Sequence, residues 1–364
     1  MKKGILAVVL CFLLAISCRA VDVLQQEADI LHTDSLYDGL SSEDRDKLEG
    51  IQPTSVGDFG SQMWNVLSDS LTDAGENLRE GLTSACSVLA AAILCAAVDS
   101  LDTKLSKNAI RTVGAISITL LCTANLRGMI GLSTSMLDKI TNFSVLLLPT
   151  LSSAAAASGA MTASAALYVG SSLFMSILSS LIRSLLIPFV YAFVGLSTAE
   201  SALGDDRLSG LRKLIGWVIQ EALRTIMYLF TGYLTITGIL SGSADVVTLK
   251  AAKAALSGAI PVVGGIASDA TETVLAGAGV LKNAIGIFGM MAVLAIGIAP
   301  FFRIGISYLC LKLVTAVSTA AACKEHIQLL ENLTAAMGYL LAMAGCSILM
   351  TLVSCSCFIK VVSG

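Results

Sequence analysis

The sequence predicts an all-α protein: a polytopic helical membrane bundle of about seven to eight transmembrane helices, preceded by a cleaved signal peptide and a short exported acidic segment. Of the 364 residues, 55% are hydrophobic and only 13% are charged, whereas soluble domains carry about 25% charged residues. Aromatic residues make up 5% and glycine reaches 31 residues, as expected where helices pack closely through small side chains. The sequence lacks alternating ten-residue strands with aromatic girdles, which disfavours a porin-like barrel.

Residues 1–20 have the pattern of a signal peptide. Lys2 and Lys3 form a positive n-region, and residues 4–16 form an apolar h-region too short to span a bilayer. Cleavage after Ala20 is one expectation. Lipid attachment at Cys18 is the alternative, although its preceding residues match a lipobox poorly. In either case the chain after residue 20 begins outside the cytoplasm.

Residues 21–80 form an exported acidic segment, expected to be partly helical or disordered. Fourteen acidic residues stand against three basic ones, a net charge of −11, so nucleic acid is not an expected partner. The segment contains no cysteine, which excludes a disulfide framework there. About sixty residues with so few aromatic side chains give a marginal core, and we therefore expect short amphipathic helices.

Apolar windows then follow one another along the chain. A transmembrane helix needs about 20 predominantly apolar residues. Residues 81–242 are expected to form a first transmembrane group, and residues 284–364 the last transmembrane helices. The windows that meet or approach the required length are 82–98, 112–133, 142–160, 163–182, 184–203, 214–241, 284–302, 304–322 and 333–358. Because some are short or contain proline, we expect seven or eight spans.

Basic residues between the windows predict the orientation. Loops 99–111 and 204–213 each carry three Lys or Arg residues, and the positive-inside rule places both on the cytoplasmic face. Arg183 and Arg303 are expected at membrane boundaries, and Asp138–Lys139 is expected to be a solvated loop pair.

Segment 243–283 is expected to be a broken, amphipathic Gly/Pro segment on the outer face. Its first part carries Lys250 and Lys253, and it breaks at Pro261 and at Gly264–Gly265. A broken helix is tolerated at membrane depth only where protein or a water-filled cavity satisfies the freed backbone groups. The segment lacks both GxxxxGK[ST] and GxGxxG, so nucleotide binding is not expected.

The second part of this segment predicts a new helix. Asp269 and Glu272 form a variant capping box, so the helix should begin near Ala270. One face of this helix is apolar, and the other carries Lys282 and Asn283. Two interpretations stay open: a structural connector, or an assembly or path-lining surface. The candidate residues for such a surface are Lys250, Lys253, Pro261, Gly264, Gly265, Asp269, Glu272, Lys282 and Asn283.

Glu221 and Arg224 lie three residues apart in the window 214–241. On a helix they can pair on one face and partly neutralise each other. Ionisable residues at membrane depth face a bundle interior or mark a pathway, whereas a pair near the membrane surface snorkels into the interface. Both interpretations of this candidate intramembrane pair stay open.

The sequence gives no pattern of catalytic residues, and neither a cofactor nor a metal is expected. It holds only two histidines and no CxxC pair among its ten cysteines, so a zinc site or a Ser/His/Asp arrangement is not supported. We therefore expect a protein that is not an enzyme.

Part of the sequence resembles a known family. Residues 258–265 (GAIPVVGG), 268–274 (SDATETV) and 281–286 (LKNAIG), together with the order of signal, polar segment and polytopic body, are similar to the stage III sporulation protein AE family of endospore-forming Firmicutes. The resemblance implies a multi-pass protein of the mother-cell membrane that faces the engulfed forespore. It also implies a place in a multi-protein channel or secretion-like apparatus joining the two cells.

Two functions of different classes follow. The first is a membrane subunit of the sporulation channel, without chemistry of its own, whose partners are other membrane subunits and the lipid bilayer. The second is an autonomous secondary transporter or permease for a small solute. Transporters often carry corresponding broken helices in two halves. Here the pairs Pro149/Pro188 and Pro261/Pro300 have the same spacing, but their flanking residues do not repeat.

Overall fold

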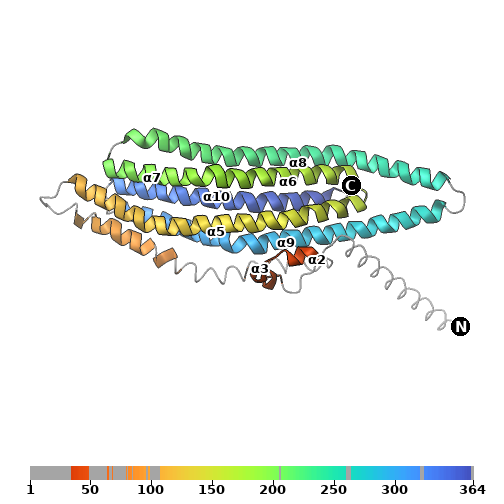
Figure 1. Cartoon of the computed structure of the whole chain (residues 1–364), viewed down its shortest axis with the longest axis horizontal. Coiled ribbons are helices and arrows are strands. Elements are labelled where there is room, and N and C mark those ends of the chain that lie inside the picture. Colours follow the sequence, from red (N-terminus) through yellow and green to blue (C-terminus); the bar gives the residue numbers. More distant parts are fainter. Residues whose placement is uncertain are drawn as a thin grey trace.

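The computed structural model describes residues 34–48, stretches of 64–98, and residues 107–204, 206–259, 264–319 and 324–361. Every element within these residues is helical (Figure 1). The predicted signal peptide lies outside the described residues and stays a prediction.

Long antiparallel helices form the body of the described chain. They are α5 (Lys107–Ala157), the rod made of α6 (Met161–Leu181), the π-helical turn η1 (Ile182–Leu186) and α7 (Ile187–Leu203), then α8 (Ser209–Ala259), α9 (Gly264–Ser318) and α10 (Lys324–Lys360). A 3-10 turn, η2 (Asp206–Leu208), precedes α8. Helix α10 contacts the four other long elements and is the central helix of the bundle.

The predicted count of seven to eight spans is not confirmed. Among the described residues, four helical stretches are long and apolar enough to cross a membrane: Thr112–Ala157, Met161–Leu203, Leu275–Ser318 and Lys324–Lys360. Each of the first three contains two windows that the sequence separates, such as 163–182 and 184–203. The sequence separates these windows at prolines and isolated charges, but the helices continue through them.

Three prolines lie in or at the start of helices without ending them. Pro149 and Pro300 are inside α5 and α9. A helix-interior proline removes one hydrogen bond and bends the helix, but the packed neighbours hold these helices together. Before Pro188 the backbone widens: the Ile187 N–H donates to the Ile182 carbonyl, five residues earlier. Such π-bulges accommodate local strain within a continuous helix.

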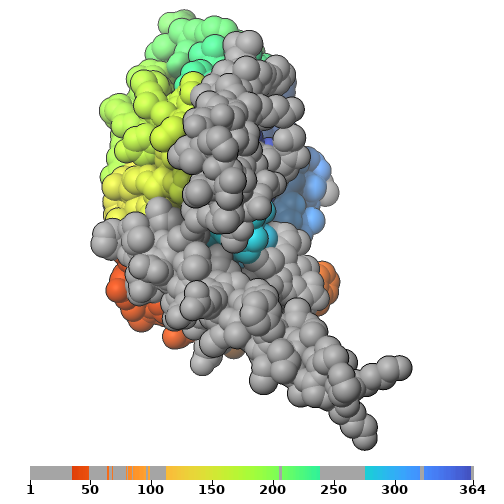
Figure 2. All heavy atoms as spheres, turned by 90° about the vertical axis from the view of Figure 1, so that its right-hand side faces the viewer, coloured from red at the N-terminus to blue at the C-terminus, as the bar shows by residue number. Residues whose placement is uncertain are grey.

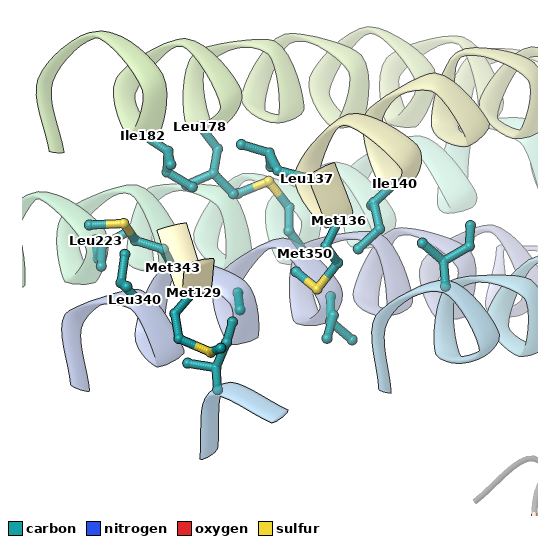
Figure 3. Close-up of a cluster of buried hydrophobic side chains, with 14 of the residues drawn as sticks. Met129, Met136, Leu137, Ile140, Leu178, Ile182, Leu223, Leu340, Met343 and Met350 are labelled. Atoms are coloured by element: carbon teal, nitrogen blue, oxygen red, sulfur yellow. The ribbon is translucent and has the colours of Figure 1, made fainter. Parts of the chain in front are cut away.

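The core of the bundle is apolar along its middle. Figure 3 shows side chains from α5, α6, η1, α8 and α10 meeting there. They include Met129, Met136, Leu137, Ile140, Leu178, Ile182, Leu223, Leu340, Met343 and Met350, all less than a tenth exposed. The unbranched methionines fill irregular gaps between helices. The centre of the bundle is therefore packed with apolar side chains.

The described part of the first basic loop, residues 107–111, lies at the same end of the bundle as the connection between α7 and α8. Because successive helices are antiparallel, the start of α5 and the α7–α8 connection meet there, and Thr112 Oγ1 donates to the Ala202 carbonyl at 3.1 Å. The turn between α5 and α6 and the C-terminus lie toward the other end. The arrangement agrees with the predicted orientation of loops 99–111 and 204–213, while the side of the membrane that they face stays a prediction.

Part of the acidic segment packs against the bundle. Helices α2 (Asp34–Asp38) and α3 (Ser42–Asp46) contact α5 and α9. The side chains of Leu36 and Leu48 are fully buried. The Tyr37 ring lies 6.4 Å from the Phe288 ring. This segment is therefore partly attached to the helical body.

The expectation that Asp138 and Lys139 form a solvated loop pair was wrong. Both lie in the middle of α5. Lys139 Nζ lies 3.1 Å from the buried carboxylate of Asp44 in α3, and Asp138 pairs with Arg183 of η1. Each charge has a partner on a different element, which the sequence order does not reveal.

Candidate functional site

Segment 243–283 forms a helical hairpin at one end of the bundle. Helix α8 continues to Ala259 and α9 begins at Gly264, and both run beyond the ends of the other helices (Figure 1). The predicted break at Pro261 falls between these two helices, on residues outside the described ones, and stays a prediction. The predicted helix start near Ala270 was wrong, because α9 is already helical six residues earlier.

The capping box is overridden by the longer helix. Asp269 and Glu272 lie within α9 and not at its start. A capping box states a local preference, and the helix continues past it toward the segment that packs on α5 and α10. The backbones of Lys250, Lys253, Gly264 and Gly265 also belong to the hairpin. Its role as an assembly or path-lining surface stays a prediction.

Lys282 joins α9 to the end of α10. Its side chain is buried, and Nζ donates to the Ile359 carbonyl at 2.9 Å. The last carbonyls of a helix lack partners within that helix and attract cations. Lys282 therefore stabilises the C-terminal end of α10. The neighbouring Asn283 has a buried Oδ1 without a hydrogen-bond partner among the described atoms.

Glu221 and Arg224 form the ion pair that the sequence predicts. Arg224 Nη1 lies 3.1 Å from Glu221 Oε2 on one face of α8. The side chains are 57% and 39% exposed, so the pair lies on the outer surface of the bundle and not in its core. Exposed pairs of this kind contribute about 1 kcal/mol or less.

A buried polar cluster at the basic end of the bundle was missed by the sequence reasoning. Arg212 Nε donates to Glu200 Oε2 at 2.6 Å, and its Nη2 lies 3.5 Å from Oε1. Arg212 Nη1 donates to Asn332 Oδ1 at 2.7 Å, and Gln328 Nε2 donates to Glu200 Oε1 at 3.4 Å. The cluster connects the end of α7 with the start of α8 and of α10.

The sequence analysis counted Arg212 only among the basic residues of loop 204–213 that predict the orientation in the membrane. The signal that could have found the cluster is a polar residue at the edge of each of two apolar windows, Glu200 in 184–203 and Asn332 just before 333–358. In the structure the side chains of Glu200 and Arg212 are less than a tenth exposed. A buried charge needs a partner of opposite charge, and Glu200 and Arg212 are such partners for each other.

A polar cleft of about 120 Å³ lies beside this cluster. Its walls are Ser197, Glu200, Ser201, Gly204, Lys324, Glu325, Gln328, Leu329 and Asn332. Ser201 Oγ donates to the Glu325 carbonyl at 3.1 Å, which links α7 to α10 next to the cleft. The guanidinium of arginine stays protonated in proteins, so Arg212 keeps the charge that holds these helix ends together. Within the described ranges, no three His, Cys, Asp or Glu side chains are grouped as a metal site would require.

Comparison with known proteins places this bundle in a family. The model of the family described as "Stage III sporulation protein AE (spore_III_AE)" matches residues 47–362. The chain belongs to this family. The match covers α5 to α10, including the polar cluster and the hairpin, and it begins after α2 and α3. Membership gives the protein a role in sporulation.

A curated relative supports the same family. The stage III sporulation protein AE of Bacillus subtilis (strain 168) is 26% identical over 175 residues, which cover 48% of this chain and 44% of the relative. The match thus spans less than half the length of that relative. No solved structure matches the chain.

Proposed function

We propose that this protein is a non-enzymatic integral membrane subunit of a multi-protein sporulation channel or secretion-like complex that links mother cell and forespore. Its place is the mother-cell membrane around the forespore, where it supports endospore development. Family membership carries this proposal, and four helices long and apolar enough to cross a membrane support it. The partners are other membrane subunits and the bilayer.

The packed core gives this proposal a specific form. Methionine and leucine side chains fill the middle of the bundle (Figure 3), and interiors packed in this way leave no continuous space for a solute. A path through the complex would therefore run between subunits and not through the core of one chain. The α8–α9 hairpin projects from the bundle and is suited to contact other subunits.

Co-purification tests the proposal. The tagged protein, solubilised from sporulating cells, should retain other sporulation membrane proteins. The Gly264→Val/Gly265→Val variant should insert at near-normal amounts but retain fewer of them and block spore formation, because β-branched bulk replaces two glycines at the start of α9. Recovery of the tagged protein without other sporulation membrane proteins, from cells that form spores at the wild-type frequency, would contradict a role in a complex. Full retention and normal sporulation by the glycine variant would reduce the hairpin to a connector.

The alternative, an autonomous secondary transporter, gains no support from the helices. It predicted corresponding broken helices in two halves, but Pro149 and Pro300 lie inside continuous helices. Solute flux through liposomes that contain only this purified protein would favour the transporter.

A further inference from the structure

The long helices exceed the thickness of a bilayer. The α6–α7 rod has 43 residues and α8 has 51, which correspond to about 65 and 76 Å at 1.5 Å per residue. The hydrocarbon core of a bilayer is about 30 Å thick. If the helices cross the membrane, only about half of the bundle can lie within it.

A set of charged residues surrounds the bundle near its mid-length. We call it the charged girdle, and it consists of Asp138, Lys139, Arg183, Glu221, Arg224 and Arg303. The Asp138–Arg183 pair joins α5 to η1, and both side chains are nearly half exposed. Four of the five long elements described therefore contribute charges, and the central α10 does not.

Contacts between helices show that these charges share one level. The Phe174 and Phe230 rings lie 5.6 Å apart, and Phe193 lies beside Gly216. Arg183 lies between the two phenylalanines of the α6–α7 rod, and residues 221–224 lie between Gly216 and Phe230 of α8. The charges of these two neighbouring elements therefore face the same level of the bundle.

The charged residue of α9, Arg303, lies close to the same level of the bundle. Gly297 lies beside Ile140 of α5, and Ser307 Oγ lies 3.6 Å from Met129 Sδ of α5. Arg303 lies between these two contacts and thus close to the level of Asp138.

On one side of the girdle, toward the α5–α6 turn, each long element contains a stretch without charged residues, and on α8 and α9 charged residues of the hairpin follow beyond it. The charge-free stretches are 140–157, 161–182, 225–244, 283–302 and 332–359. On α5, α6, α8 and α9 they extend about 27–33 Å along the helix axis, which matches the hydrocarbon core of one bilayer.

The other half of the bundle is different. It exposes Arg127 on α5, Lys213 on α8, Lys312 on α9 and Glu331 on α10. Charges at the bilayer centre cost several kcal/mol each, so this half is unsuited to a position within the hydrocarbon.

Helices α2 and α3 limit the lipid contact to one side. They pack on α5 and α9 and carry the exposed carboxylates of Asp38 and Glu43. Figures 1 and 2 show them at the edge of the bundle opposite α8. On the α6–α8 side, large apolar side chains are exposed instead: Val169, Leu173, Ile177, Leu229 and Ile236.

We propose that the charge-free half is the membrane-embedded half, that it meets lipid through α6 and α8, and that the charged girdle lies at one membrane surface. The other half, with the Arg212 cluster, stands outside the bilayer. This inference rests on the membrane location proposed above and not on the channel role.

Tryptophan quenching tests the placement in the full chain. The two native tryptophans, Trp64 and Trp217, are replaced by phenylalanine, and one tryptophan is introduced per variant. Leu173→Trp and Ile236→Trp report on the charge-free half, and Leu120→Trp and Leu313→Trp on the other half. All four positions are more than half exposed, so the larger side chain does not disturb the core.

In phosphatidylcholine vesicles brominated deep in the acyl chains, the variants at 173 and 236 should lose most of their fluorescence, and those at 120 and 313 should lose almost none. Aqueous iodide should give the opposite order. Strong lipid quenching at 120 and 313 would overturn the placement while the membrane location stands. Absence of lipid quenching at all four positions would overturn both. Loss of partner proteins in the co-purification would overturn the channel role alone.

Discussion

Replacing Arg212 by methionine should destabilise the bundle by about 3 kcal/mol. The methionine keeps an apolar stem beside the Phe193 ring, which the guanidinium carbon approaches to 6.0 Å. The variant loses the donors to Glu200 and Asn332 at 2.6 and 2.7 Å. The carboxylate of Glu200 then stays buried, and within this cluster it keeps the Gln328 amide as a donor at 3.4 Å.

Breaking a buried, hydrogen-bonded ion pair costs about 3–5 kcal/mol, chiefly because one charge stays without its partner. We expect the lower end of this range, since the cleft of about 120 Å³ beside Glu200 has room for water. Changing both partners, Glu200→Leu with Arg212→Met, leaves no unpaired charge. The double variant should therefore lose about 2 kcal/mol less free energy of unfolding than the sum of the losses in the two single variants.

The measurement is denaturant unfolding of the detergent-solubilised protein, followed by its helical circular dichroism. Lys213→Met is the matched control, because it removes a neighbouring base that is exposed, and it should shift stability by about 0.5 kcal/mol or less. Equal stability of Arg212→Met and Lys213→Met would refute the reasoning, as would strict additivity in the double variant.

Three further outcomes are expected. Gly170→Ala should lower stability by about 1–3 kcal/mol in the same unfolding assay, because a Cβ at this position of α6 would overlap a tyrosine ring of α8. Gly195→Ala, where no atom lies within 4 Å of the added Cβ, is the control and should be neutral or stabilising. Equal effects of the two substitutions would contradict the close packing at Gly170. Exchanging the charges of Glu221 and Arg224 should reduce sporulation less than reversing either charge alone, since the exposed pair contributes at most about 1 kcal/mol; loss of function on Glu221→Gln with none on Arg224→Gln would show that the carboxylate acts alone. A cysteine at Ser61, with accessible native cysteines removed, should react with an impermeant maleimide without permeabilisation, and labelling only after permeabilisation would overturn the predicted orientation.

Local and compositional features of the sequence predicted much of the architecture. The low charge content predicted helices that can cross a membrane. The pairing of Glu221 with Arg224 was also predictable, because residues three apart on a helix are neighbours whatever the fold.

Helix ends were predicted less well, because a local signal competes with packing along the whole element. Pro149 and Pro300 remain inside helices, and the capping box at Asp269 does not begin one. A proline inside a helix costs about 3 kcal/mol, and an N-cap contributes about 1 kcal/mol. An extended interface with neighbouring helices outweighs them.

The sequence by itself therefore determined the helical class, the membrane-compatible composition and the contacts between residues close in the chain. Only the tertiary structure decided which charges become partners: Arg212 with Glu200, Asp138 with Arg183, and Lys139 with Asp44. It also brought the uncharged Asn332 to the Arg212 guanidinium. The physical reason is that a charge is stabilised by whichever opposite charge packing brings within a few ångströms. The separation of Arg212 and Asn332, 120 residues along the chain, leaves no local pattern from which that approach can be inferred.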